Sequence, residues 1–343
     1  MDATSFARNL DAHLTSVTRR RGGLGAPLAA VRGADLDYRF GTPDLPFHAA
    51  SVGKLVTTAL TVGQFPDVGT RLADVLPPAA LTGLFAPGAE TTVTLRHLLQ
   101  HTSGVADYFD GRVTSGQRTL KLLARDPQRA WTPQDLLAIT RERQRPVGTP
   151  GQRFHYSDTG FVLLGLALEE ATGQRFEDLV HTRVFEPLGM HRAFLPWRTQ
   201  PATGSSTIAP LRLGRHEYTA SPALTVDWAG GGIAATVDDW LTLSAALHDG
   251  RLLPPGTFAD LTTPLHRMRP GLHYGTGVMT VRFEGFMPWL RGWPRPVGHL
   301  GVLAAHLWRF PTHGVDVVLG FGATGEMSRS FRTLFEVARL LGR

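Results

Sequence analysis

Apolar residues near both ends of the chain recur three or four positions apart. They are Phe6, Leu10, Leu14 and Val17 near the start, and Phe331, Leu334, Phe335, Ala338 and Leu341 near the end. This spacing places apolar side chains on one face of a helix. We therefore predict one amphipathic helix that stops at Gly22-Gly23 and a second amphipathic helix that closes the chain.

Short apolar runs near both ends are typical of strands. The predicted strands span 27–31, 36–40, 273–283, 302–310 and 315–321. The turns that would close two hairpins are Gly33-Ala34-Asp35 and Pro311-Thr312-His313-Gly314. Helical spacing fills the middle of the chain, over 95–101, 133–143, 159–172, 176–185 and 237–247. This order predicts one sheet made from the two ends of the chain, with a helical insertion between them.

The apolar helical run over 47–64 opens at Ser51, and Ser51-Val52-Gly53-Lys54 is a Ser-x-x-Lys step. Side chains three apart on a helix share a face, so the Lys54 amine can reach the Ser51 hydroxyl. The helix N-terminus favours an alkoxide and disfavours a protonated amine, which are the conditions for a nucleophilic serine. The alternative is a serine helix cap followed by a chance surface lysine.

Composition strengthens the nucleophile hypothesis. Of 35 lysines and arginines, only Lys54 and Lys121 are lysine. Arginine cannot release its proton, whereas a desolvated lysine can. A lysine at this position therefore indicates that a titratable amine is needed there.

The 343 residues, 42% hydrophobic and 19% charged, indicate an ordered globular chain. The net charge is +6, but the arginines are scattered without interleaved aromatic residues, so we expect no nucleic-acid partner. The absence of cysteine excludes disulfides and thiol catalysis. No apolar run has the length of a membrane span, and Asp2, Arg8 and Asp11 interrupt the place of a signal-peptide core. We expect a cytoplasmic protein, or a periplasmic or secreted one if a leader was removed.

A second candidate is Tyr156-Ser157-Asp158, which follows a glycine-rich turn at 148–151 and precedes the helix at 159–172. A tyrosine beside an ammonium group would have its pKa lowered from about 10, so that Tyr156 could take and return a proton. The alternative is a helix cap with Asp158 as the N-cap residue.

A third candidate is Gly298-His299-Leu300-Gly301, which leads into the strand predicted from Val302. An edge strand running past a nucleophile can offer a backbone N–H to an oxyanion, and Gly301 would let a substrate approach closely. His299 would bind a carboxylate or tune the tyrosine. The alternative is a simple turn.

Metal and nucleotide motifs are weak in this sequence. His97 and His101 lie four apart on a helix, but Gln100 stands where a metalloprotease needs Glu, and no third ligand is evident. Gly230-x-Gly232-x-x-Ala235 resembles a dinucleotide fingerprint without the βαβ unit that it requires. We therefore expect neither a metal nor a cofactor.

The three candidate motifs are more informative together than separately, because of their order and spacing along the chain. Ser-x-x-Lys is followed by Tyr-x-Asp about 105 residues later and by His-x-Gly about 140 residues beyond. In this the chain resembles serine hydrolases of the class C β-lactamase-like and penicillin-binding-protein superfamily, which includes esterases, D-aminopeptidases and D,D-carboxypeptidases. The resemblance extends over most of the chain, through 95–108, 150–165, 184–190 and 230–240.

The resemblance implies an α+β fold, with an antiparallel sheet flanked by helices and a helical subdomain. The expected single domain, 1–343, would have an α/β part at 1–66 and 225–343 and a helical part at 67–224. Ser51 would be the acylated nucleophile, Lys54 its activating partner and Tyr156 the proton shuttle. The backbone N–H groups of Ser51 and Val302 would form the oxyanion hole. His299 would take the place of the third-motif Lys or His.

Two departures from the family pattern bear on the substrate. Asp158 stands where Asn is usual, and its charge would keep Lys54 protonated and move the base role toward Tyr156. Leu300 replaces a residue that often carries a hydroxyl, so a carboxylate-bearing substrate such as penicillin loses a donor. An aromatic loop at 284–296 would either wall an acyl pocket or pack on the surface.

Both departures favour a carboxylesterase that acts on small neutral esters. The alternatives are β-lactamase, D,D-carboxypeptidase or D-aminopeptidase activity on amides or peptides. A non-catalytic binding protein on the same fold remains a further alternative, because a fold does not fix a function. The expected partner is thus a small ester, lactam or peptide substrate, and the sequence leaves the oligomeric state open.

Overall fold

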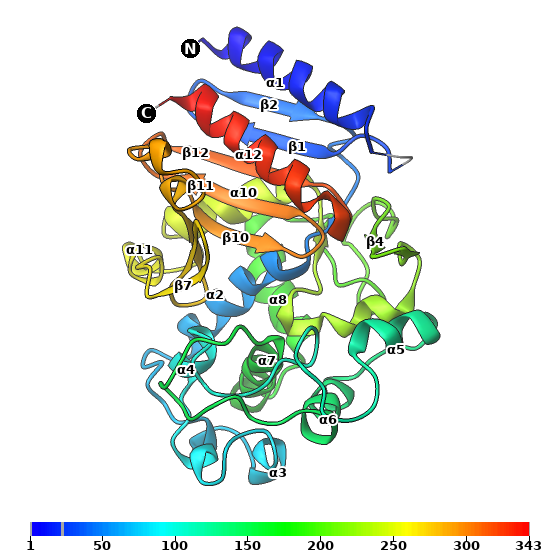
Figure 1. Ribbon diagram of the computed structural model, residues 1–343, viewed down its shortest axis with the longest axis vertical. Coiled ribbons are helices and arrows are strands. Elements are labelled where there is room, and N and C mark those ends of the chain that lie inside the picture. The colour runs from blue at the N-terminus through cyan, green and yellow to red at the C-terminus, as the bar shows by residue number, and fades with distance from the viewer. Residues whose placement is uncertain (1, 22–23, 343) are drawn as a thin grey trace.

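The computed structural model describes residues 2–21 and 24–342, and within them the main sheet has eight strands. The strand order is β2-β1-β12-β11-β10-β9-β8-β7, and every pair is antiparallel. The bounds are β1 Leu28–Arg32, β2 Asp37–Phe40, β7 His266–Arg269, β8 Leu272–Tyr274, β9 Met279–Val281, β10 Val297–Gly301, β11 Ala305–Phe310 and β12 Val315–Gly320. Strand β1 pairs with β12, the last strand, and β2 pairs with β1, so the predicted sheet made from both chain ends is confirmed (Figure 1).

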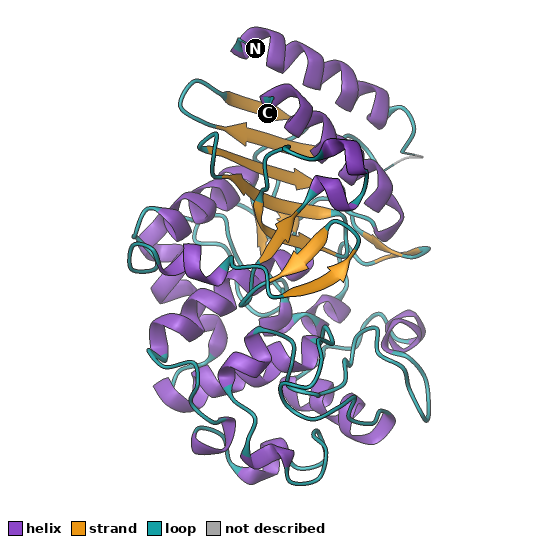
Figure 2. Ribbon diagram, turned by 60° about the vertical axis from the view of Figure 1, so that its left-hand side comes forward, coloured by secondary structure: helices purple, strands orange, loops and turns teal. Residues whose placement is uncertain are grey.

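Helices cover both faces of this sheet (Figure 2). Helix α1 (Ala3–Thr18) and helix α12 (Met327–Leu341) pack on one face, and helix α10 (Val237–His248) and helix α2 (Lys54–Gln64) pack on the other. Strand residues alternate between the two cores, because successive side chains of a strand point to opposite faces. In β12, Val317 faces α1 and α12, while Val318 faces the core that holds α2.

The remaining helices gather below the sheet in Figure 1, around the buried helix α7 (Asp158–Thr172). They are α3 Pro78–Leu81, α4 Leu95–Leu99, α5 Thr119–Arg125, α6 Pro133–Arg143, α8 Phe176–Val180 and α9 Glu186–Leu188, with α11 Thr257–Leu261 near the sheet edge. Helix α7 contacts α2, α4 and α6. It therefore joins the helical region to the helix that follows Ser51. No helix among the described residues is long and apolar enough to cross a membrane.

The helix predicted over 47–64 is divided into three elements. Phe47–His48 forms strand β3, which pairs with strand β6 (Ala234–Ala235). Ala50–Gly53 is a turn of 3₁₀-helix, and α2 begins only at Lys54. The break has a local cause: Ala50 has φ +48°, in a region that non-glycine residues adopt rarely. The remaining small sheet pairs β4 (Arg212–Leu213) with β5 (His216–Glu217).

Two predicted strands were wrong in their bounds. The stretch 273–283 is a hairpin of β8 and β9, because Gly277 turns the chain with φ +73°. The strand predicted from Val302 starts at Ala305, and Val302 lies in the turn after β10. β10 is also an inner strand, not the expected edge strand. However, β9 pairs only with its first two residues, Val297 and Gly298.

Other predictions fell close to the observed elements. The predicted helix at 133–143 has the bounds of α6, and the first predicted helix ends at Thr18. Its predicted stop, Gly22-Gly23, lies outside the described residues. Ser157, not Asp158, is the N-cap residue of α7, and its hydroxyl accepts from the Gly160 N–H at 3.3 Å. The division into an α/β part and a helical part stays a prediction.

Candidate active site

Ser51 lies on the 3₁₀ turn before α2, beside the inner strand β10 of the sheet. Main chain packs against this turn from two sides. A Cβ on Gly231 would lie 2.3 Å from the Ala50 carbonyl oxygen, and a Cβ on Gly301 would lie 2.2 Å from that of Ala49. Both positions therefore need glycine, because any larger residue would displace the turn that carries Ser51.

The Lys54 side chain is completely buried and has three polar partners. Its Nζ lies 3.1 Å from the Ser51 Oγ, and it also donates to the Asp158 carboxylate and to the Gly230 carbonyl oxygen. An ammonium group has three donors, so each of them has an acceptor here. The ring centroid of Phe161 lies 5.0 Å away and adds a cation–π contact. The predicted approach of Lys54 to Ser51 is thus present, and Asp158 pairs with the ammonium.

Tyr156 also contacts the Ser51 side chain. The Tyr156 ring stacks on His101 at a centroid distance of 4.2 Å and lies 5.3 Å from the Lys54 Nζ. The predicted lowering of its pKa was wrong. Burial raises the pKa of Tyr156 well above its usual value, the Asp158 charge raises it further, and only the contact with Ser51 lowers it notably.

A further carboxyl group, that of Asp107, lies behind Asp158 and was not predicted. It accepts from the backbone N–H groups of Asp158 at 3.0 Å, Phe109 at 3.2 Å and Asp110 at 2.9 Å. Burial, and then the charge of Asp158, raise the pKa of Asp107 to about 7. Its place within the family-like stretch at 95–108 was the one available signal.

His299 is completely buried on β10. Its Nε2 lies 3.2 Å from the Tyr274 hydroxyl, and the Tyr274 ring lies edge-on to Tyr156 with centroids 5.9 Å apart. Burial, followed by the charge of Lys54, lowers the pKa of His299 to about 3, so the imidazole is neutral. A buried neutral ring favours the second of its predicted roles, support of the tyrosine. Tyr274 is the link that sequence reasoning missed.

The two histidines that resembled zinc ligands have other contacts. The His97 Nδ1 accepts from the Thr94 N–H at 3.2 Å, which completes the cap of α4. The His101 Nδ1 accepts from the Ser157 N–H at 3.1 Å, directly before Asp158. Both residues therefore shape the backbone around the site.

The aromatic loop at 284–296 packs on the opposite side of the sheet. Phe286 contacts Phe331 and Phe335 of α12, with ring centroids 5.6 Å and 5.5 Å apart. Helix α12 lies on the sheet face that α2 does not occupy. These contacts support the surface-packing alternative for this loop.

An antiparallel sheet that carries a Ser-x-x-Lys turn against an inner strand fits the superfamily that the sequence resembles. The family model described as Beta-lactamase matches residues 10–337, and the chain belongs to this family.

Two curated relatives share part of their length with this chain. A D-aminopeptidase of Gluconobacter oxydans is 26% identical over 282 residues, which cover 76% of this chain and 49% of the relative. Penicillin-binding protein 4 of Amycolatopsis lactamdurans is 35% identical over 162 residues, which cover 44% of this chain and 36% of the relative. The chain therefore spans about half, or less, of the length of these relatives.

A solved structure shows the same fold over the whole length. A D-stereospecific amidohydrolase from Streptomyces superposes with a TM-score of 0.78, covering 98% of this chain and 99% of that chain. The two are 22% identical in sequence. This similarity extends to the arrangement of the elements and confirms the expected α+β fold.

Proposed function

We propose that this protein is a serine hydrolase that forms an acyl-enzyme on Ser51. The observation that carries the proposal is the 3.1 Å contact between the Ser51 Oγ and the Nζ of the completely buried Lys54. A nucleophilic serine needs a partner within hydrogen-bond reach and a group that orients this partner. Lys54 is such a partner, and Asp158 with the Gly230 carbonyl orients it.

The proton leaves Ser51 through Lys54. As the Ser51 oxygen attacks the carbonyl carbon, its proton passes to Lys54 Nζ, while Lys54 passes one proton to the Asp158 carboxylate. The lysine thus remains an ammonium and Asp158 becomes neutral. The developing oxyanion is stabilised by the N–H groups of Ser51 and Val302, in the roles that the family resemblance implies.

Tyr156 donates the proton to the leaving group. Its raised pKa keeps the phenol protonated at rest, which suits a general acid. The resulting phenolate lies beside Lys54 and regains a proton from it, and Asp158 returns one proton to the lysine. Water then attacks the acyl-enzyme and releases the acid, which restores Ser51.

Small esters are the proposed preferred substrates. Asp158 offers no N–H to the carbonyl of an amide substrate, and its carboxylate is already engaged by Lys54. An alkoxide also leaves more readily than an amine. Amides of amino acids are the second candidate, since one relative is named a D-aminopeptidase and a structural neighbour a D-stereospecific amidohydrolase.

A covalent probe tests the proposal. A fluorophosphonate should label the wild-type protein once, at Ser51, and Ser51→Ala should abolish both labelling and p-nitrophenyl butyrate hydrolysis in a folded protein. We expect a loss of at least about 10⁴-fold in kcat, as for other catalytic serines. An unlabelled wild-type protein, or a folded variant with near wild-type turnover, would favour the non-catalytic binding protein.

A further inference from the structure

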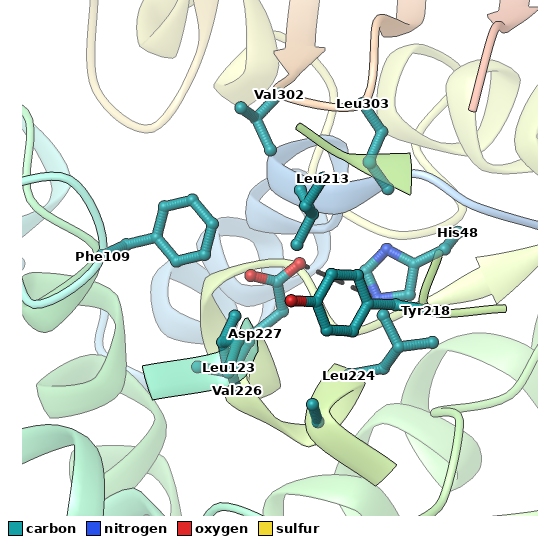
Figure 3. Close-up of a pocket in the computed structure, with 11 residues that line it drawn as sticks. His48, Phe109, Leu123, Leu213, Tyr218, Leu224, Val226, Asp227, Val302 and Leu303 are labelled. Atoms are coloured by element: carbon teal, nitrogen blue, oxygen red, sulfur yellow. Dashed lines mark ion pairs between the residues drawn. The ribbon is translucent and has the colours of Figure 1, made fainter. Parts of the chain in front are cut away.

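A small, mostly apolar pocket is lined by residues from segments that flank the Ser51 turn (Figure 3). Its walls include Phe109, Tyr218, Leu224 and Val302. His48, three residues before Ser51, forms another wall, and Val302 directly follows the Gly301 that touches the Ser51 turn. The pocket is therefore built from segments on both sides of the nucleophile. Its free space is about 10 Å³, roughly that of one water.

The Asp227 carboxylate points into this pocket (Figure 3). It lies 3.8 Å from the His48 Nε2, which is beyond hydrogen-bond distance. No hydrogen bond to this carboxylate is formed by the residues that the structure describes. The Asp227 side chain is 19% exposed, so a group from outside the protein can reach this carboxylate, which has apolar neighbours and, among the described residues, no donor within hydrogen-bond distance.

His48 does not compensate the charge. Its Nδ1 accepts from the Ala50 N–H at 3.1 Å, which leaves the proton of the neutral ring on Nε2, facing Asp227. This Nε2 is buried and has no hydrogen-bond partner. Burial lowers the pKa of His48 to about 4, so the ring stays neutral. The pocket thus holds an acceptor and a donor that no protein group satisfies.

Lys54 does not pair with Asp227 either, because its three donors are taken by Ser51, Asp158 and Gly230. Burial raises the pKa of Asp227 to about 7, and the Asp158 charge adds to this, while Lys54 lowers it. A cation placed in the pocket would offset the cost of the ionised carboxylate. The free volume suits a group of the size of water, and an ammonium group has this size.

We propose that Asp227 binds the α-ammonium group of an aminoacyl substrate while its carbonyl is held at Ser51. This inference rests on the proposed acyl-enzyme function. It makes α-amino-acid esters and unhindered amides the substrate class, and it makes Asp227 the specificity-determining residue. The side chain of the acyl group stays outside the pocket, because the free space accepts only the ammonium.

A pair of nearly isosteric substrates isolates the ammonium. Alanine benzyl ester, in both enantiomers, differs from benzyl isobutyrate by one ammonium group in place of a methyl group. At pH 7 we expect kcat/KM to favour at least one alanine enantiomer by tenfold or more. Asp227→Asn should lower this ratio at least tenfold, and Asp227→Glu should lower it less. Asp110→Asn, which changes an exposed carboxylate nearby, is the matched control and should leave the ratio unchanged.

Three results overturn the inference: equal kcat/KM for alanine and isobutyrate esters, a ratio that Asp227→Asn leaves intact, or an equal change in Asp110→Asn. The substrate comparison in the wild-type protein decides the question even if Asp227→Asn fails to fold.

Binding without turnover separates this inference from the proposed function. Ser51→Ala should bind one enantiomer of alaninamide at least tenfold more tightly than isobutyramide in calorimetry. If the wild-type protein cleaves neither ester but this preference is seen, the acyl-enzyme proposal fails and the ammonium pocket stands. If both esters are cleaved and neither assay shows a preference, the pocket inference alone fails.

Discussion

Two carboxylates lie near Lys54, the buried Asp158 and the partly exposed Asp227, and they differ in their partners. Asp158 contacts the ammonium directly, whereas Asp227 faces a pocket with a neutral histidine 3.8 Å away. Burying a charge is tolerated when it is paired and hydrogen-bonded. The paired carboxylate is therefore explained by the protein itself, whereas the partner proposed for the unpaired one is the ammonium group of a substrate. On this proposal, Asp158 organises the nucleophile and Asp227 selects the substrate.

Removing the lysine would turn the paired carboxylate into an unpaired one. Lys54→Met keeps much of the side-chain volume but leaves the Asp158 carboxylate buried without its cation. We expect a loss of about 3–5 kcal/mol in the free energy of unfolding, the usual result of breaking a buried ion pair. Chemical denaturation measures this loss.

The double variant Lys54→Met/Asp158→Asn is the control for that loss, because it removes both charges and should recover much of the stability. If the single variant and the wild type are equally stable, the ion pair between Lys54 and Asp158 contributes nothing to the free energy of unfolding.

Changing Asp158 alone would test whether this carboxylate sets the preference between ester and lactam substrates. Asp158→Asn frees Lys54 from its carboxylate and supplies an amide that can both donate and accept. We expect nitrocefin hydrolysis to rise relative to ester hydrolysis, even if both stay slow. One altered contact supplies about 1–3 kcal/mol, or roughly 10–200-fold. The ratio of the two kcat/KM values, in the wild type and the variant, is the measurement. An unchanged ratio would remove the main support for ester preference.

The smallest expected effect is on the pH dependence of stability. The folded protein holds the protons of Asp107 and Asp227 up to about pH 7, whereas the unfolded chain releases them near 3.8. Between these values the folded state binds more protons, so stability falls as the pH rises from about 4 to 7.

Asp227→Asn removes one of these two groups and should make the decline shallower. Thermal unfolding between pH 5 and 6 should show the wild-type Tm falling by about 1–2 °C more than that of the variant, which is what about 1 kcal/mol produces in a chain of this size. Parallel curves would mean that Asp227 is already ionised in the empty pocket.

The sequence predicted the parts of the site that follow from local spacing. Ser51 and Lys54 lie three apart, and they meet although the turn is 3₁₀ in place of the expected α-helix. The residues 47–48 were predicted as helix because they directly precede the apolar helical run, and two residues are too few to show a strand pattern. Pairing with a segment almost 190 residues away made them a strand.

Groups brought together by the tertiary fold could not be predicted. Asp227 and Tyr274 belong to no sequence motif. Their importance follows from their neighbours in the fold, His48 for Asp227 and His299 for Tyr274, which are distant in sequence. The pKa of Tyr156 was predicted in the wrong direction for the same kind of reason. The direction depends on burial and on the nearby charge of Asp158, and spacing along the chain gives neither.

The turn that bears Ser51 is held by main chain on two sides, at Gly231 and Gly301. Side chains of the neighbouring pocket do not enter these two contacts. Residues such as Phe109, Tyr218 and Asp227 can therefore be replaced over evolutionary time, or by an engineer, without displacing the nucleophile. In such a scaffold the turn that carries the nucleophile stays fixed, while the pocket side chains that would select the substrate can vary. Library mutagenesis restricted to the pocket walls other than His48, which holds the Ala50 N–H, is accordingly the direct route to new acyl specificities in this chain.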